Sequence, residues 1–120
     1  MNLHISPKGL VSEIQKQFNE AFPFLKLEFF NKKSMSAGFS ANQIVSPAKK
    51  IGEVQLAVTD GDLEISDGMR VNELENVLKA KFGLIAHVFR RSGNLWLETT
   101  ITGNWTLLQQ NSHGREITTG

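Results

Sequence analysis

The chain repeats its own hydrophobic pattern at a spacing of 60 residues, and this repeat constrains the fold more than any other feature. Residues 2–34 align with residues 62–94 without a gap. Each segment contains an alternating apolar run, a run of helical period and a second alternating run, which is the order strand, helix, strand. The repeat therefore predicts two β-α-β units. Seven aligned pairs are identical, namely Leu3, Ile5, Ser6, Val11, Glu13, Phe22 and Phe29 with Leu63, Ile65, Ser66, Val71, Glu73, Phe82 and Phe89.

The two predicted helices have clear end signals. Ser6 can cap the first helix, Pro7 suits its first position, and Pro23 ends it. The second helix is predicted from about Arg70 to Lys81 and ends at Gly83, which readily adopts the left-handed conformation. The predicted buried stripes are Leu10, Val11, Ile14, Phe18, Ala21 and Phe22 in the first helix, and Val71, Leu74, Leu78 and Phe82 in the second.

Strands are predicted over residues 24–31 and 84–91, because both runs are rich in aromatic and branched side chains. Alternate residues of a strand share one face, so each strand turns one set inward. If the second strand has the same orientation as the first at an offset of 60 residues, His87 points inward, in a row of otherwise apolar side chains. The residues predicted to point into the core are Leu25, Leu27 and Phe29, with Ile85, His87 and Phe89 at the equivalent positions.

The hairpin that follows the second of these strands has two alternative registers. A two-residue turn at Ser92-Gly93 places His87 opposite Glu98 across the ladder. A turn one residue later shifts the pairing and places Arg91 opposite Trp96. The first register would give a buried imidazole an acceptor, and the sequence leaves the choice open.

The C-terminal quarter of the chain is predicted to extend the sheet and then to fray. Residues 95–101 and 105–109 have the composition of two more antiparallel strands joined by a Gly-Asn turn, which together form a meander. Residues 111–120 are polar and are expected to be a C-terminal tail outside a single domain over residues 1–110.

The segment between the repeats differs in character from both of them. Ser46-Pro47 repeats the opening of the first helix, so a short helix is expected over about residues 47–55. Residues 32–45 are predicted to form a loop. The predicted fold class is α+β and ferredoxin-like, with duplicated β-α-β units on one antiparallel sheet and the helices on one face.

Four short signatures carry a resemblance to other proteins. They are Phe82-Gly83-Leu84, Arg91-Ser92-Gly93, Trp96-Leu97-Glu98-Thr99 and Trp105-Thr106-Leu107. The chain resembles a family of small uncharacterised bacterial α+β proteins with these signatures. The resemblance implies no activity and no site.

Composition excludes several classes of function. The 120 residues include no Cys, so disulfides, cysteine-ligated metals and cysteine nucleophiles are excluded. The three His residues lack metal-ligand spacing, and no phosphate-binding or nucleophile motif occurs, so we expect neither a metal nor a cofactor. The net charge of +1 gives no broad attraction to nucleic acid or lipid. Without a signal-like N-terminus or a long apolar run, we expect a cytoplasmic protein with no membrane contact.

Two groups of residues are candidate sites. His87 is a candidate general base oriented by Glu98, because imidazole titrates near neutrality and a carboxylate fixes its tautomer. A core histidine satisfied by a cross-strand partner explains the same residues and is favoured. The second group is a basic hairpin framed by aromatic rings, which suits single-stranded nucleic acid. Its members are Arg90, Arg91, Lys32, Lys33, Trp96 and Trp105.

A protein-binding role explains more of the sequence than either site does. Both faces of the predicted sheet carry apolar residues, and the helices cover only one of them. We therefore favour a non-catalytic, self-associating or adaptor-like binding module, with a homodimer or a protein partner on the uncovered face. Single-stranded nucleic-acid binding is the alternative, and small-ligand binding or an enzyme using His87 is the second alternative.

Overall fold

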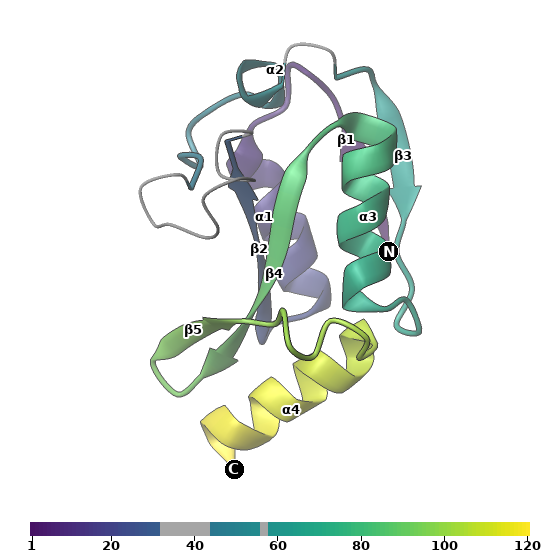
Figure 1. Ribbon diagram of the computed structural model, residues 1–120. Helices are drawn as coiled ribbons and strands as arrows, with labels where there is room; N and C mark the ends of the chain where they lie inside the picture. Colours follow the sequence, from purple (N-terminus) through teal and green to yellow (C-terminus); the bar gives the residue numbers. More distant parts are fainter. Residues whose placement is uncertain (32–43, 56–57) are drawn as a thin grey trace.

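The computed structural model describes residues 1–31, 44–55 and 58–120. The predicted 32–45 loop lies largely outside them, as do Lys32 and Lys33. In chain order the elements are β1 (Asn2–Ile5), α1 (Val11–Ala21), β2 (Leu25–Phe30), α2 (Ile51–Val54), β3 (Gly61–Glu64), α3 (Val71–Phe82), β4 (Ile85–Ser92), β5 (Leu95–Glu98) and α4 (Leu107–Thr119), as shown in Figure 1. Within these residues no helix is both long enough and apolar enough to cross a bilayer.

The fold is α+β, but its strands form two antiparallel sheets rather than the single predicted one. One sheet pairs β1 with β3, and the other has the order β2-β4-β5. The sheet ends at β2 because α1 occupies its outer edge. Gln15 Nε2 donates to the Leu27 carbonyl (2.8 Å), and Asn19 Nδ2 donates to the Leu25 carbonyl (2.8 Å). Since these carbonyls are already bonded, β2 has no free edge there for β3.

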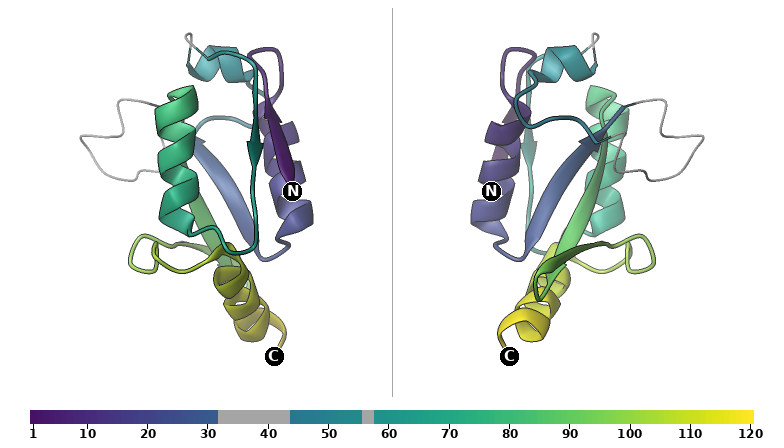
Figure 2. Two further views of the ribbon diagram at one scale, coloured as in Figure 1. Left: turned by 90° about the vertical axis from the view of Figure 1, so that its right-hand side faces the viewer. Right: turned by 90° about the vertical axis from the view of Figure 1, so that its left-hand side faces the viewer.

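The core lies between the two sheets and the two long helices. Figure 2 shows α1 and α3 on opposite sides of the space between the two sheets. The prediction that both helices pack on a single sheet is therefore wrong, because the strands form two sheets. Each helix lies against strands of its own half, α1 against β1 and β2 and α3 against β4. The predicted helical stripes are confirmed at most positions: Val11, Ile14, Phe18, Phe22, Val71, Leu74, Leu78 and Phe82 are all buried.

The first helix starts later than its Ser-Pro signal predicts. Ser6 to Gly9 form a turn, and α1 begins at Val11, because its first amides are bonded by a distant turn instead of a side-chain cap. The turn before α2 makes the reciprocal bonds. The four N–H to carbonyl bonds are Val11 to Lys49 (2.9 Å), Ser12 to Pro47 (3.0 Å), Ile51 to Gly9 (2.8 Å) and Gly52 to Pro7 (2.9 Å). The short helix predicted over 47–55 is consequently confined to Ile51–Val54.

The turns before α3 and α4 are joined in the same way. The bonds are Val71 to Trp105 (3.0 Å), Asn72 to Gly103 (2.8 Å), Leu107 to Met69 (2.8 Å) and Leu108 to Asp67 (3.1 Å). At all four helix starts, the third helical residue is Glu or Gln, and its side chain accepts from the backbone N–H just before the helix. Each helix start is therefore stabilised partly by a segment distant in sequence.

The strand β4 turns the opposite set of residues inward from the set predicted. Leu84, Ala86 and Val88 are buried, whereas Ile85, His87 and Phe89 lie half-buried on the outer face. The connection from helix to strand explains the error. Buried residues on either side of it are three positions apart in the first half (Phe22 and Leu25) and two apart in the second (Phe82 and Leu84). A shift of one residue moves every side chain of a strand to the other face.

The C-terminal residues form a helix instead of a sixth predicted strand and a frayed tail. Residues 107–119 are α4, and the predicted strand over 105–109 is wrong. The missed signal is local: Thr106 Oγ1 accepts from Gln109 N–H (3.1 Å), and Gln109 Oε1 accepts from Thr106 N–H (2.8 Å). This is a capping box, which marks a helix start in the sequence.

The helix α4 packs on β4 mainly through polar and small residues spaced four apart. Gln110, fully buried, accepts from Arg90 Nη1 (3.2 Å), and Thr118 Oγ1 accepts from Gly93 N–H (3.2 Å). Between them, a Cβ on Gly114 would lie 3.0 Å from the Arg90 side chain, so the absence of a side chain allows close approach. Because these contacts are polar, a search for an apolar stripe does not find this helix.

Candidate functional site

The β4–β5 hairpin has the second of the two predicted registers. Arg91 lies opposite Trp96 and Ser92 opposite Leu95, with Gly93 at a positive φ of 61° in the turn. Glu98 lies opposite Phe89. The register that paired His87 with Glu98 is therefore wrong.

His87 has carboxylate neighbours other than the predicted one. Across the ladder it faces Glu28, and its Nδ1 lies 3.5 Å from Glu75 Oε1 of α3. The other oxygen of Glu75 accepts the Val88 N–H at 3.0 Å. The ring also meets Phe30 at a centroid distance of 5.1 Å. Because Glu75 binds the β4 backbone, it supports the strand as well as contacting the imidazole.

The basic hairpin does not form one patch. Successive residues of a strand point to opposite faces, so Arg90 faces α4 while Arg91 faces the other side of the sheet. Arg91 Nε donates to the Gly93 carbonyl at 3.0 Å. Trp96 shares the Arg91 face, and Lys26 Nζ lies 5.1 Å from the centre of its ring, in cation–π contact.

Trp105 is separate from that group. Its ring packs edge-on against His113 of α4, with ring centres 5.4 Å apart. Of the predicted binding residues that the structure describes, only Arg91 and Trp96 come together, and sequence reasoning missed their neighbour Lys26. The contact between Lys26 and Trp96 could not be predicted from the alternation of residues 24–31, because Lys26 lies on β2 and reaches Trp96 across the intervening strand β4.

Exposed apolar side chains gather at the C-terminal end of the chain. In the described ranges, every large apolar side chain that is well exposed lies between residues 95 and 117. We call this set the C-terminal apolar surface. It comprises Leu95 (65 % exposed) and Leu97 (40 %) on β5, Ile101 (98 %) in the following loop, and Leu108 (50 %) and Ile117 (45 %) on α4.

The same part of the molecule has an open sheet edge. Beyond the hairpin, the outer edge of β4 is protected: Glu75 accepts the Val88 N–H, and Thr99 Oγ1 donates to the Val88 carbonyl at 2.8 Å. In contrast, β5 is the last strand of its sheet, and no strand of the described chain pairs with its outer side. Open edges recruit further strands unless charge, proline or a covering element prevents this.

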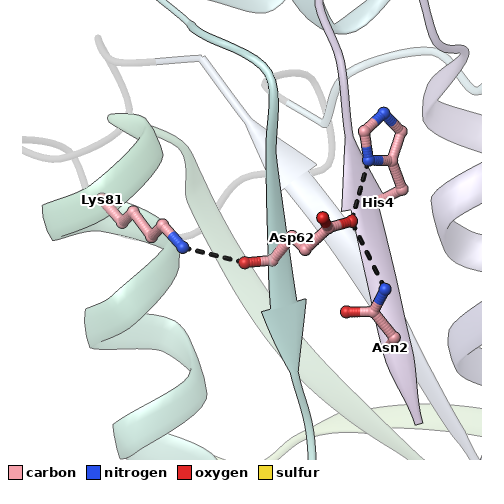
Figure 3. Close-up of polar contacts among 4 residues, drawn as sticks. All are labelled: Asn2, His4, Asp62 and Lys81. Carbon is pink, nitrogen blue, oxygen red and sulfur yellow. Dashed lines mark hydrogen bonds and ion pairs between the residues drawn. The ribbon is translucent and has the colours of Figure 1, made fainter.

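A polar cluster lies on the outer face of the other sheet (Figure 3). Asp62 Oδ1 meets His4 Nδ1 (2.9 Å) and accepts from Asn2 Nδ2 (3.3 Å), while Lys81 Nζ donates to the Asp62 carbonyl (2.8 Å). The hydrogen bond with His4, and then that with Asn2, lowers the pKa of the Asp62 carboxyl. His4 and Asp62 are 58 % and 64 % exposed, so the cluster is a solvated surface of β1 and β3.

A search for metal sites in the described ranges finds no group of three or more His, Asp or Glu side chains suited to hold an ion. The chain was also compared with protein-family models, with curated proteins and with solved structures, and none of the three comparisons found a match.

Proposed function

We propose that the chain is a non-catalytic binding module that self-associates through its C-terminal apolar surface. The observation that carries the proposal is the confinement of the exposed large apolar residues to 95–117, while such residues elsewhere in the described chain are covered. Exposed apolar side chains that adjoin one another typically mark an interface, and Leu95 and Leu97 adjoin on one face of β5. A homodimer is the simplest assembly, because one surface then serves both partners.

We also propose that the two halves repeat one β-α-β unit, in a variant of the ferredoxin-like plan in which β1 with β3 and β2 with β4 form separate sheets. In its support, Leu3 pairs with Leu63 at the centre of the β1–β3 ladder. Residues sixty apart on the two helices, Phe18 and Leu78, are both fully buried.

The alternatives have less support. For nucleic acid, Lys26 and Arg91 do flank Trp96, but Lys26 already covers a face of that ring on which a base would stack. For catalysis, the carboxylate beside His87 is bonded to the Val88 backbone. Titration of a labelled single strand at low salt tests the first alternative, since electrostatic binding is strongest there; absence of binding would exclude it.

Sedimentation equilibrium tests self-association. The monomer has a mass of 13.4 kDa, and the weight-average mass is expected to rise towards twice that value as concentration increases. The double variant Leu95→Ser/Leu97→Ser should shift this rise to higher concentration, and Asn2→Ser, on the outer face of β1, is the matched control. A wild-type mass that stays at 13.4 kDa up to about 100 µM, a range that covers ordinary weak dimers, would refute the proposal.

A further inference from the structure

The backbone groups of Trp96 point away from the body of the protein. Arg91 N–H donates to the Phe24 carbonyl (2.9 Å), so it is directed towards β2 and not towards β5. In an antiparallel ladder, two opposed residues either exchange both hydrogen bonds or direct all their polar groups outward. Because Trp96 is opposed to Arg91, its N–H and C=O lie on the open edge of β5.

The side chains of β5 are self-complementary about this residue. The first three residues of β5 are Leu95-Trp96-Leu97, and this order of residue types is the same in either direction. Both leucines lie on the face of the sheet that carries Arg90 and Ser92, and Trp96 lies on the other face. A symmetric interface requires a patch that matches itself under a twofold rotation, and this strand meets the requirement.

We propose that the occupant of the β5 edge is β5 of a second copy, antiparallel, with Trp96 on the twofold axis. This proposal rests on the self-association proposed above and specifies where it occurs. The two Trp96 residues exchange reciprocal N–H to C=O bonds, and their rings meet on one face. On the other face, Leu95 of each chain lies opposite Leu97 of its partner. The two sheets then form one continuous sheet through the dimer.

The pairing accounts for the main unusual features of the hairpin. It bonds the polar groups that an edge strand leaves open, and it covers Leu95 and Leu97, which are 65 % and 40 % exposed. The other edges of the same sheet are already occupied: β2 is covered by side chains of α1, and β4 beyond the hairpin by Glu75 and Thr99. A strand of four residues supplies a small interface, so we expect weak association.

Introduced cysteines test the register, because the chain has no cysteine of its own. A hydrogen-bonded antiparallel pair holds its Cα atoms about 5.5 Å apart, which suits a disulfide. Trp96→Cys should therefore cross-link to itself under mild oxidation. The control is Lys16→Cys on α1, whose side chain is 78 % exposed and which lies outside the C-terminal apolar surface. Effective concentrations in the millimolar range at an interface predict cross-linking on the order of 100-fold faster for Trp96→Cys than for the control at micromolar protein.

Two further variants define the pairing more closely. A mixture of the Leu95→Cys and Leu97→Cys proteins should give mainly the mixed disulfide, because position 95 of one chain lies opposite position 97 of its partner in the proposed dimer. Equal rates for Trp96→Cys and Lys16→Cys, in a protein that still self-associates, would overturn the β5 pairing but leave the binding module intact. A wild-type protein that remains monomeric would overturn both.

A proline variant tests the backbone bonds independently of any cysteine. Trp96→Pro removes the outward N–H but none of the β4 ladder, a position at which an edge strand tolerates proline. Trp96→Val keeps that N–H and is the matched control for loss of the ring. We expect dimerisation to be lost in the proline variant and retained, though weakened, in the valine variant, with both chains folded by circular dichroism. Equal dimerisation of the two variants would contradict the proposed bonds.

Discussion

The contact between α4 and β4 depends on Gln110, and replacing this residue by Met should destabilise the protein. Gln110 is fully buried; its Oε1 accepts from Arg90 Nη1 (3.2 Å), and its Nε2 donates to the Thr102 carbonyl (3.0 Å) and hydroxyl (2.5 Å). Methionine has a similar volume and makes none of these bonds. Arg90 Nε is already buried without a hydrogen-bond partner among the described residues. Losing the bond to Gln110 would therefore affect a guanidinium group that already lacks one hydrogen bond.

The magnitude follows from the bonds removed. A neutral hydrogen bond contributes about 1 kcal/mol and one to a charged group about 1.5–3 kcal/mol. Since both Thr102 acceptors share one donor group, we expect a loss of about 2–4 kcal/mol in the free energy of unfolding. With a urea m-value of about 1–3 kcal/mol per molar, the unfolding midpoint should fall by about 1–2 M.

The assay is urea unfolding followed by circular dichroism, with Arg115→Ala as the control on the same helix. Arg115 is exposed, so its replacement should change the stability by less than about 0.5 kcal/mol. Hydrogen exchange of the α4 amides should accelerate in the Gln110 variant before the rest of the chain unfolds. If the two variants unfold at the same urea concentration, then Gln110 does not anchor α4 and the reasoning fails.

Three further predictions concern the core, a helix end and the surface of β1 and β3. Phe82→Ala should lower the free energy of unfolding by about 3–5 kcal/mol, because the ring is 4 % exposed and its removal leaves a cavity; a loss below about 1 kcal/mol would contradict the observed core. Gly83→Ala should lower the melting temperature slightly more than Gly93→Ala: both have positive φ, but only at position 83 would the new Cβ displace another group, the end of the Gln55 side chain at 2.9 Å. The hydrogen bond with His4 lowers the pKa of Asp62 in the folded protein. The ionised Asp62 carboxylate therefore stabilises the fold fully at a pH above the pKa that Asp62 has in the unfolded chain, and this stabilisation is lost as the pH falls through the lower pKa of the folded state. In a carboxyl-carbon NMR titration, His4→Gln should therefore raise the pKa of Asp62, and an unchanged midpoint would exclude His4 as the main cause.

Local periodicity predicted the elements whose burial follows a single stripe or alternation. The stripe of α1 and α3 is a property of spacing alone, so Phe18 and Leu78 are recognisable as core residues before any contact is known. Gly83 likewise marks the end of α3 by its backbone freedom, and it has a φ of 67°. The C-terminal apolar surface is different: its residues are visible in the sequence, but their exposure is not.

Errors arose where a distant segment or a shift of one residue decides the outcome. The start of α1 depends on carbonyls of residues 47 and 49, and the inward face of β4 depends on a connection one residue shorter than its counterpart. The candidate pairing of His87 with Glu98 failed because the hairpin turn lies one residue further on. In the last two cases a shift of one residue changes the result, and the hydrophobic pattern is insensitive to a shift of that size.

The sequence by itself determined the strand-helix-strand order of both halves and the residues that fill the helical core, because those properties depend on spacing within one segment. Only the tertiary structure decided that there are two sheets, that α4 packs against β4, and that β5 has an open edge. The physical reason is that side chains of α1 end one sheet, and that polar bonds through Gln110 hold α4. Hydrogen bonds between distant residues leave no periodic trace in the chain.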